Sequence, residues 1–198
     1  MLPGIAIAIK GHYYKTGRLL SKLDNFVPVP GYSGSKLTPD KTHEFDPSAK
    51  TAVLLVSGFN GRELHTLFSV FRIFEKTFKN FIFVQVGVVD AGNFKGFSEI
   101  ENLKTQIKND LDRYVNFVQQ NGYYAEGLYA IGVDVVDEIV QITLKILERF
   151  PSPVFFGGQL IFPNESFLSR MLHNYTLFAV QRRLYNKGIP VVIMPIRV

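Results

Sequence analysis

The 198-residue chain contains no cysteine and no tryptophan. Without cysteine it can form no disulfide, no thiolate zinc site and no cysteine nucleophile, and such a composition fits a reducing compartment such as the cytoplasm. Long apolar runs are also lacking, since residues 2–9 (LPGIAIAI) fall far short of the roughly 20 that a membrane-spanning helix needs. That stretch is not a convincing signal peptide, because no basic residue precedes it and no small-residue cleavage site follows it.

A strong charge of either sign is absent from most of the chain. The formal net charge is +5. Residues 1–50 hold seven Lys/Arg against four Asp/Glu, whereas residues 51–198 hold 15 against 13. The larger part is therefore close to neutral for its size, which argues against a nucleic-acid surface. Apolar residues make up 46% of the chain, enough to fill a core, so we expect a folded protein.

The composition divides the chain into three parts. Residues 1–24 join the apolar stub to KGHYYKTGRLLSKLD, in which cations stand beside tyrosines and leucines at helical spacing. Such a segment can lie on an anionic membrane surface, and an amphipathic helix docked on the domain is the alternative. Residues 25–50 are rich in Pro, Gly, Ser and Thr and predict an extended linker. Residues 51–198 predict one α/β domain.

Apolar runs and helix-periodic stretches alternate from residue 51 to the end. The run TAVLLVSGFNG and its helix are followed by FIFVQVGVV, which is apolar almost throughout, as a strand covered on both faces must be. Glycines and prolines punctuate the later segments. The pattern predicts strands at 51–57, 81–89, 123–131, 154–162 and 190–198, and helices at 62–78, 98–121, 134–150 and 166–187.

This order predicts a five-stranded, mostly parallel, doubly wound Rossmann-like sheet with helices on both faces. The usual strand orders for such a sheet are 3-2-1-4-5 and the flavodoxin-like 2-1-3-4-5. We expect the strand at 51–57 to be central. The more polar strand at 123–131 and the last strand, interrupted by Pro195, should lie at the edges.

A ligand of such a sheet is expected beyond the carboxyl ends of the strands, at the point where the strand order reverses. The glycines of Gly58-x-x-Gly61 before a helix could present backbone N–H groups to an anion. The segment lacks the third glycine of the dinucleotide fingerprint and the Lys-Ser/Thr of a P-loop. The candidate ligand-binding residues are Ser57, Gly58, Asn60, Gly61, Asp90, Gly92, Asn93, Gly157 and Gly158.

No pattern in the sequence demands catalysis, a metal or a cofactor. Ser57 lacks the surrounding glycine elbow of hydrolases, and Asp90 has no partner carboxylate nearby in sequence. His65 and His173 fall within predicted helices, where packed histidines are the expectation. The local group His43, Glu44 and Asp46 is interpreted as a solvated turn rather than a metal site. We therefore predict no catalytic residue, no metal site and no cofactor.

Three stretches together resemble a known family: KTAVLLVSGFNGRELHTLFSVFRIF, FKNFIFVQVGVVDAGNFKG and HNYTLFAVQRRLYNKGIPVVIMPIRV. They are similar to the carboxyl-terminal soluble domain of bacterial and archaeal permeases of the amino acid–polyamine–organocation superfamily. That domain is similar in fold to universal stress proteins and to the cytosolic domain of cation–chloride cotransporters. The GHYYK segment resembles the residues that follow the last membrane helix in such permeases.

The resemblance implies a non-enzymatic regulatory or assembly domain of a secondary transporter, at the cytoplasmic face of the cell membrane. It implies a transmembrane transporter domain in the same chain, a possible homodimer, and contact of residues 10–24 with anionic lipid. The alternatives are a free-standing universal-stress-protein-like binder of a nucleotide or other small anion, and a hydrolase-like enzyme using Ser57 with a histidine. The sequence after Gly157-Gly158 departs from the pattern of nucleotide-binding stress proteins, so the resemblance does not imply nucleotide binding.

Overall fold

A computed structural model gives the fold and describes residues 44–89, 97–161 and 167–197. Within these ranges strands and helices alternate, as the sequence predicts. The elements are β1 (Lys50–Val56), α2 (Gly61–Ile73), β2 (Phe78–Val88), α3 (Phe97–Gln120), β3 (Tyr124–Gly132), α4 (Val135–Arg149), β4 (Pro153–Ile161), α5 (Phe167–Tyr185) and β5 (Val191–Arg197).

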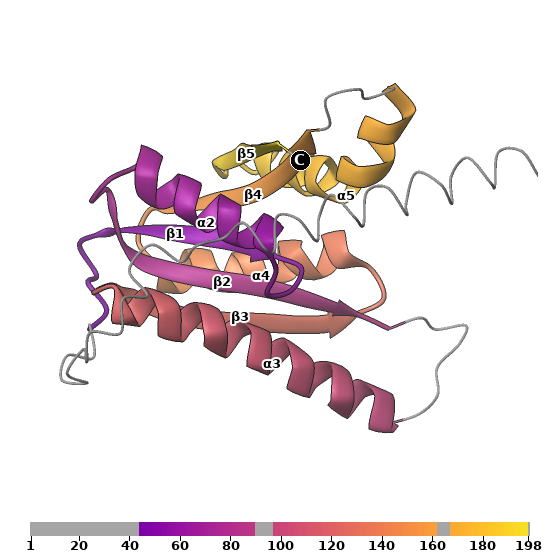
Figure 1. Cartoon of the computed structure of the whole chain (residues 1–198), viewed down its shortest axis with the longest axis horizontal. Coiled ribbons are helices and arrows are strands. Elements are labelled where there is room, and N and C mark those ends of the chain that lie inside the picture. The colour runs from indigo at the N-terminus through magenta and orange to yellow at the C-terminus, as the bar shows by residue number, and fades with distance from the viewer. Residues whose placement is uncertain (1–43, 90–96, 162–166, 198) are drawn as a thin grey trace, which may run out of the picture.

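The five strands form one sheet in the order β3-β2-β1-β4-β5, and every neighbouring pair is parallel. Strand β1 is central, whereas β3 and β5 lie at the two edges (Figure 1). The predicted doubly wound α/β class is confirmed, and of the two predicted orders the structure has 3-2-1-4-5. The order reverses between β1 and β4, so their carboxyl ends mark the position where such sheets bind ligands.

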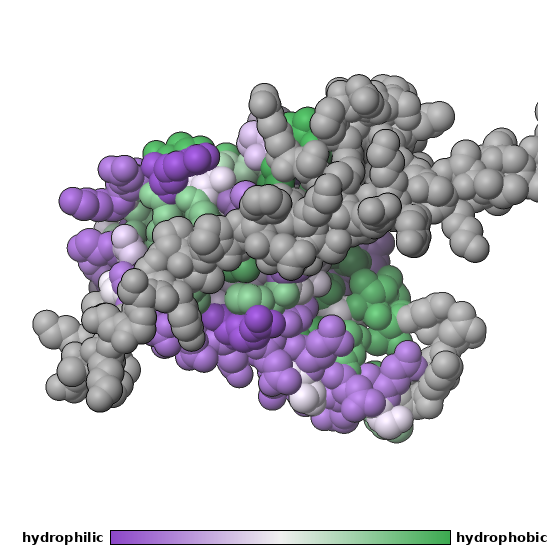
Figure 2. Space-filling model, viewed as in Figure 1, coloured by the Kyte–Doolittle hydropathy of each residue, from purple (hydrophilic) through white to green (hydrophobic). Residues whose placement is uncertain are grey.

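Helices cover both faces of the sheet. Helices α2 and α3 pack with Ala52, Leu54 and Val56 of β1, and α4 and α5 pack around Val53. Because successive strand residues point to opposite faces, β1 contributes to two hydrophobic clusters at once. Ala52, Val53 and Leu54 are fully buried. The exposed side of α3 forms a hydrophilic strip along the lower edge of Figure 2, where the helix faces solvent.

Helix α2 is shorter than predicted. The spacing of Phe71, Phe74 and Phe78 extends a helical pattern to residue 78, but α2 ends at Ile73 with Phe74 as its C-cap. Lys76 has a φ of 56°, and a turn from Phe74 to Thr77 redirects the chain. Phe78 is then the first residue of β2, where its ring meets that of Phe156 edge-on at 5.5 Å. Phe78 therefore belongs to β2, where it packs against Phe156 of β4, although its spacing in the sequence assigned it to the helix.

The chain enters β1 through a turn that is fixed to β2. The Asp46 carboxylate accepts hydrogen bonds from the backbone and side chain of Ser48 and pairs with Lys79 at 3.1 Å. The Asn80 side chain donates to the carbonyl oxygen of Asp46 at 2.8 Å. Residues 1–43, which include the predicted membrane-surface segment and most of the predicted linker, lie outside the described residues. Among the described helices none has the length and apolar character needed to cross a membrane.

Candidate functional site

A cavity of about 370 Å³ lies at the switch point of the sheet. Its walls come from the carboxyl ends of β1 and β2, from the middle of β4, and from the facing turns of α2, α4 and α5. A volume of this size lies in the range of small-molecule binding pockets. Most of the wall is aliphatic. Six of its aliphatic members are Leu55, Val84, Val86, Ile139, Leu177 and Val180.

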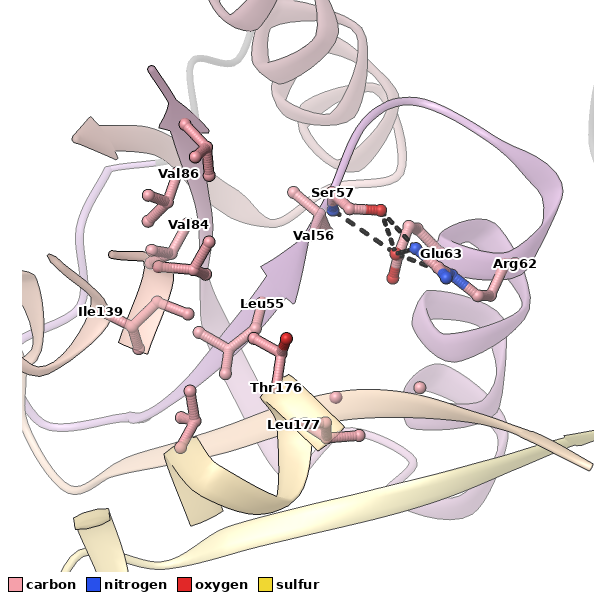
Figure 3. Close-up of a pocket in the computed structure, with 15 residues that line it drawn as sticks. Leu55, Val56, Ser57, Arg62, Glu63, Val84, Val86, Ile139, Thr176 and Leu177 are labelled. Carbon is pink, nitrogen blue, oxygen red and sulfur yellow. Dashed lines mark hydrogen bonds and ion pairs between the residues drawn. The ribbon is translucent and has the colours of Figure 1, made fainter. Parts of the chain in front are cut away.

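One end of the cavity is charged, and it is built by the turn between β1 and α2. Ser57 follows the last residue of β1, while Arg62 and Glu63 stand in the first turn of α2. The Glu63 side chain is only 5% exposed, and that of Arg62 is 27% exposed. An acid in the first turn of a helix is stabilised by the helix dipole. Figure 3 shows these three side chains directed toward one another at the end of β1.

The Glu63 carboxylate is held by its neighbours. Its Oε1 accepts from the Ser57 hydroxyl at 2.9 Å and from the Ser57 backbone N–H at 3.4 Å. The same oxygen accepts from Arg62 Nε at 3.0 Å and from Nη2 at 2.7 Å. Arg62 Nη2 also donates to the Ser57 hydroxyl oxygen. A carboxylate this buried requires such a charged partner, since an unpaired charge would cost several kcal/mol.

The start of α2 is fixed by its own cap. The side chain of Asn60 accepts a hydrogen bond from the Glu63 backbone N–H at 3.2 Å. Its backbone is extended, with φ −146° and ψ 169°, as is usual for an N-cap residue. The cap orients the first turn, so the Glu63 side chain is directed back toward Ser57 and the cavity.

The other face of this turn is anchored by α3. The Tyr114 hydroxyl donates to the carbonyl oxygen of Gly58 at 2.9 Å, and its ring stacks on Phe83 with centroids 4.7 Å apart. The Arg113 guanidinium lies 3.7 Å from the ring centroid of Phe59. Burial raises the pKa of Tyr114 well above its usual range, and the negative charge of Glu63 raises it further. The hydroxyl therefore stays protonated and remains a donor at physiological pH.

The structure brings together four of the predicted site residues and gives them different tasks. Ser57 lines the cavity and bonds to Glu63, Gly58 is held by Tyr114, and Asn60 caps α2. Gly61 is the first residue of α2. The predicted residues Asp90, Gly92 and Asn93 lie outside the described residues.

Gly157 and Gly158 lie within β4 rather than beyond its end, and both line the cavity. A Cβ at Gly157 would lie 2.3 Å from Cδ1 of Leu177 on α5. A Cβ at Gly158 would lie 2.4 Å from Oγ1 of Thr66 on α2. Close approach of two helices, one on each face, thus explains both glycines without a ligand.

Sequence reasoning missed Arg62, Glu63 and the aliphatic wall of the cavity. Glu63 carried the ordinary signal of an acid in a first turn, which says nothing about burial. His65 lies half-buried on α2, and the hydrogen bonds of Ser57 among the described residues go to Glu63 and Arg62. The His173 side chain lies outside the described part. Within that part no group of three His, Asp or Glu residues is placed to hold a metal ion.

Comparison with protein-family models and with curated proteins gives no match. Among solved structures, that of a universal stress protein from Archaeoglobus fulgidus is similar to this chain. The TM-score is 0.48 at 14% sequence identity, over 73% of this chain and 92% of that one. The fold described above follows from the strand order and does not depend on this similarity.

Proposed function

We propose that this chain is a non-enzymatic regulatory domain that binds a small molecule at the switch point and serves a secondary transporter. The observation that carries the proposal is a cavity whose charged end is neutralised within the chain, by the Arg62–Glu63 pair at 2.7 Å. Such a site can bind a small molecule but has no group that would react with it. Binding of the small molecule would then regulate the transporter at the cytoplasmic face of the membrane.

The bonding of Ser57 supports binding rather than catalysis. A serine nucleophile needs a base that takes its proton. Here the group that accepts the hydrogen bond from the Ser57 hydroxyl is the Glu63 carboxylate, which is already paired with the Arg62 guanidinium. A paired carboxylate is a weak base for an alcohol. The hydrolase hypothesis is therefore the less favoured one.

The same bonding weakens the alternative of a nucleotide or small-anion binder. A phosphate at the start of α2 would use the amide of Ser57 and the guanidinium of Arg62. The Ser57 amide and Arg62 Nη2 already donate to Glu63 Oε1, which leaves Nη1 as the part of the guanidinium without a described partner. A phosphate there would meet the carboxylate of Glu63 at close range, and like charges in a buried site repel strongly.

The transporter part of the proposal is supported by the sequence resemblance of residues 50–198 to permease cytosolic domains, and by the cations and tyrosines of residues 10–24. In this arrangement residues 10–24 would contact anionic lipid beneath a transmembrane domain, and the α/β domain would pair with a second copy. Basic residues near the cytoplasmic end of a span follow the positive-inside rule.

Two measurements test the proposal. Sequencing the transcript upstream of the codon for Leu2 should reveal apolar segments of about 20 residues in the same reading frame. A frame that stops there, with no permease gene beside it, would remove the transporter part. Incubation with activated esters and with ATP should give no turnover that Ser57→Ala abolishes, whereas turnover lost in that variant would make the chain an enzyme.

A further inference from the structure

We propose that the switch-point cavity binds an α-amino acid with a large aliphatic side chain. The zwitterionic head would meet Arg62 and Glu63, and the side chain would enter the valine-rich part. This inference rests on the proposed binding function, since it names the ligand of that site. It follows from two features: a pair of opposite charges with unused bonding capacity, and an aliphatic wall next to it.

Among the described residues, one donor group and one acceptor of the charged pair have no partner. All four hydrogen bonds that described groups donate to Glu63 end on Oε1, which leaves Oε2 without a described partner. Arg62 uses Nε and Nη2 in these contacts, so the N–H groups of Nη1 remain without a described partner. An ammonium group can donate to Oε2 while a carboxylate accepts from Nη1. The internal ion pair then stays intact when the ligand enters.

The rest of the cavity suits an aliphatic side chain. Leu55 lies on β1, two residues before Ser57 at the charged end. Val84, Val86 and Ile139 form the part of the wall that is farther from the charged end (Figure 3). Figure 3 shows Val84, Val86 and Ile139 on one side of β1, and Arg62 and Glu63 on the other. A ligand that spans both must carry its charges at one end only. Each methylene that the ligand buries against this wall adds to the affinity.

Charge balance selects a zwitterion over singly charged ligands. The Arg62–Glu63 pair is neutral as a unit, and so is an amino acid, so the complex leaves no charge uncompensated. An aliphatic amine would leave the guanidinium and its own ammonium beside a single carboxylate. An aliphatic acid would place two carboxylates against a single guanidinium. Either ligand therefore binds more weakly than the amino acid of the same carbon skeleton.

The direct test is a titration of the wild-type chain with L-leucine, followed by methyl NMR and calorimetry. Methyl signals of Val84, Val86 and Ile139 should shift together and saturate. Those of Leu111 and Val118, on the opposite face of the sheet, should stay in place. Absence of saturable shifts at the three wall residues, or shifts spread over both faces, would overturn the inference.

Matched probes separate the two halves of the site. Glycine has the head without the side chain, 3-methylbutylamine lacks the carboxylate, and 4-methylpentanoate lacks the ammonium. Each should bind about tenfold or more weakly than leucine, because each loses either apolar burial or one charge-assisted contact. Equal affinity for leucine and the amine would contradict a role of Arg62 as the carboxylate partner.

Two variants place the ligand at this site. Glu63→Gln keeps the side-chain shape and removes the charge that meets the ammonium, so leucine affinity should fall about tenfold or more. Glu101→Gln, on the exposed side of α3, is the matched control and should bind as the wild type does. Val86→Ile leaves the charged end untouched and narrows the wall, so it should lower affinity for leucine more than for alanine. Unchanged leucine affinity in both site variants would overturn the inference.

The outcomes distinguish this inference from the proposed function on which it rests. If AMP or the amine binds with shifts at Val84 and Val86 while leucine does not, the site is a binding site of another specificity and only the inference falls. If neither leucine, the amine, the acid nor AMP binds, the binding function falls with it. The transporter assignment is decided separately by the upstream reading frame.

Discussion

Tyr114 on α3 donates a hydrogen bond from its hydroxyl to the carbonyl oxygen of Gly58, 2.9 Å away and 56 positions earlier in the chain. The bond ties the longest described helix to the turn that ends the central strand. Ser57 and Asn60, which flank Gly58, bond to Glu63 and cap α2. The buried Tyr114 side chain thus fixes one side of this turn, and the other side of the turn forms the charged end of the cavity.

Replacing Tyr114 by Phe should lower the free energy of unfolding by about 1 kcal/mol, because the Gly58 carbonyl loses its strong donor while the ring stays packed. The Asn60 side chain also reaches that carbonyl, but only at 3.5 Å. Urea denaturation measures the loss. Tyr185→Phe, at a tyrosine that is 77% exposed, is the control and should be neutral. Equal stability of the two variants would show that the bond contributes nothing.

The lowered pKa of Asp46 predicts that acid destabilises the turn that leads into β1. The hydrogen bond from the Ser48 side chain, and then the contact with Lys79, lower the pKa of Asp46 from 3.8 to about 2. A lowered folded-state pKa gives stability that is present above the unfolded value and is lost as pH falls from 3.8 toward 2. Asp46→Asn should remove this part of the acid dependence in unfolding curves, whereas Asp112→Asn, on the exposed side of α3, should leave it unchanged.

Gly127 on β3 lies where α3 packs close against the sheet edge. A Cβ at this position would lie 2.8 Å from the Cβ of Leu111, an atom that cannot move without the helix backbone. Gly127→Ala should therefore destabilise the fold by about 1–3 kcal/mol, through overpacking. At Gly132 the added atom would meet the mobile end of Glu138, so Gly132→Ala should cost much less. Similar losses in thermal denaturation of both variants would contradict the packing explanation.

The Tyr124 hydroxyl should lose its proton at a higher pH than an ordinary tyrosine. This hydroxyl donates to Glu126 at 2.7 Å, and Arg149 pairs with the same carboxylate. Burial, followed by the hydrogen bond and charge of Glu126, raises the pKa of Tyr124 from 10.0 to about 12. Glu126→Gln removes the charge but not the burial, so the pKa should fall and still exceed 10.0. Tyrosine ring NMR across the alkaline range checks this, with Glu148→Gln on α4 as the control that leaves Tyr124 unchanged.

The sequence predicted the fold well, for physical reasons. Strands covered on both faces appear as unbroken apolar runs, which is why β1 and β2 were found. The choice between the two strand orders was not predictable, because it depends on which side of β1 each crossover turns. Phe78 was assigned to a helix because its spacing from Phe71 and Phe74 is helical, and only its packing on Phe156 places it in β2.

The candidate site was predictable only where local chemistry defines it. Asn60 and Gly61 carry the signature of a strand-to-helix turn, and the turn lies where expected. The burial of Glu63 comes from the approach of other elements, which no local pattern records. Gly157 and Gly158 indicated that something passes close to β4, but not that it is a pair of helices rather than a ligand.

Helix α2 contacts both the cavity and the strands on the β5 side of the sheet. Glu63 and Thr66 are three residues apart, so they stand about one turn from each other on one rigid element. Thr66 lies against Gly158 with no room for a methyl group, and Ile196 of β5 meets the same glycine. A close-packed contact of this kind transmits displacement rather than absorbing it. A tilt of α2 would therefore press Thr66 against β4 beside Ile196 of β5, at the opposite edge from β3.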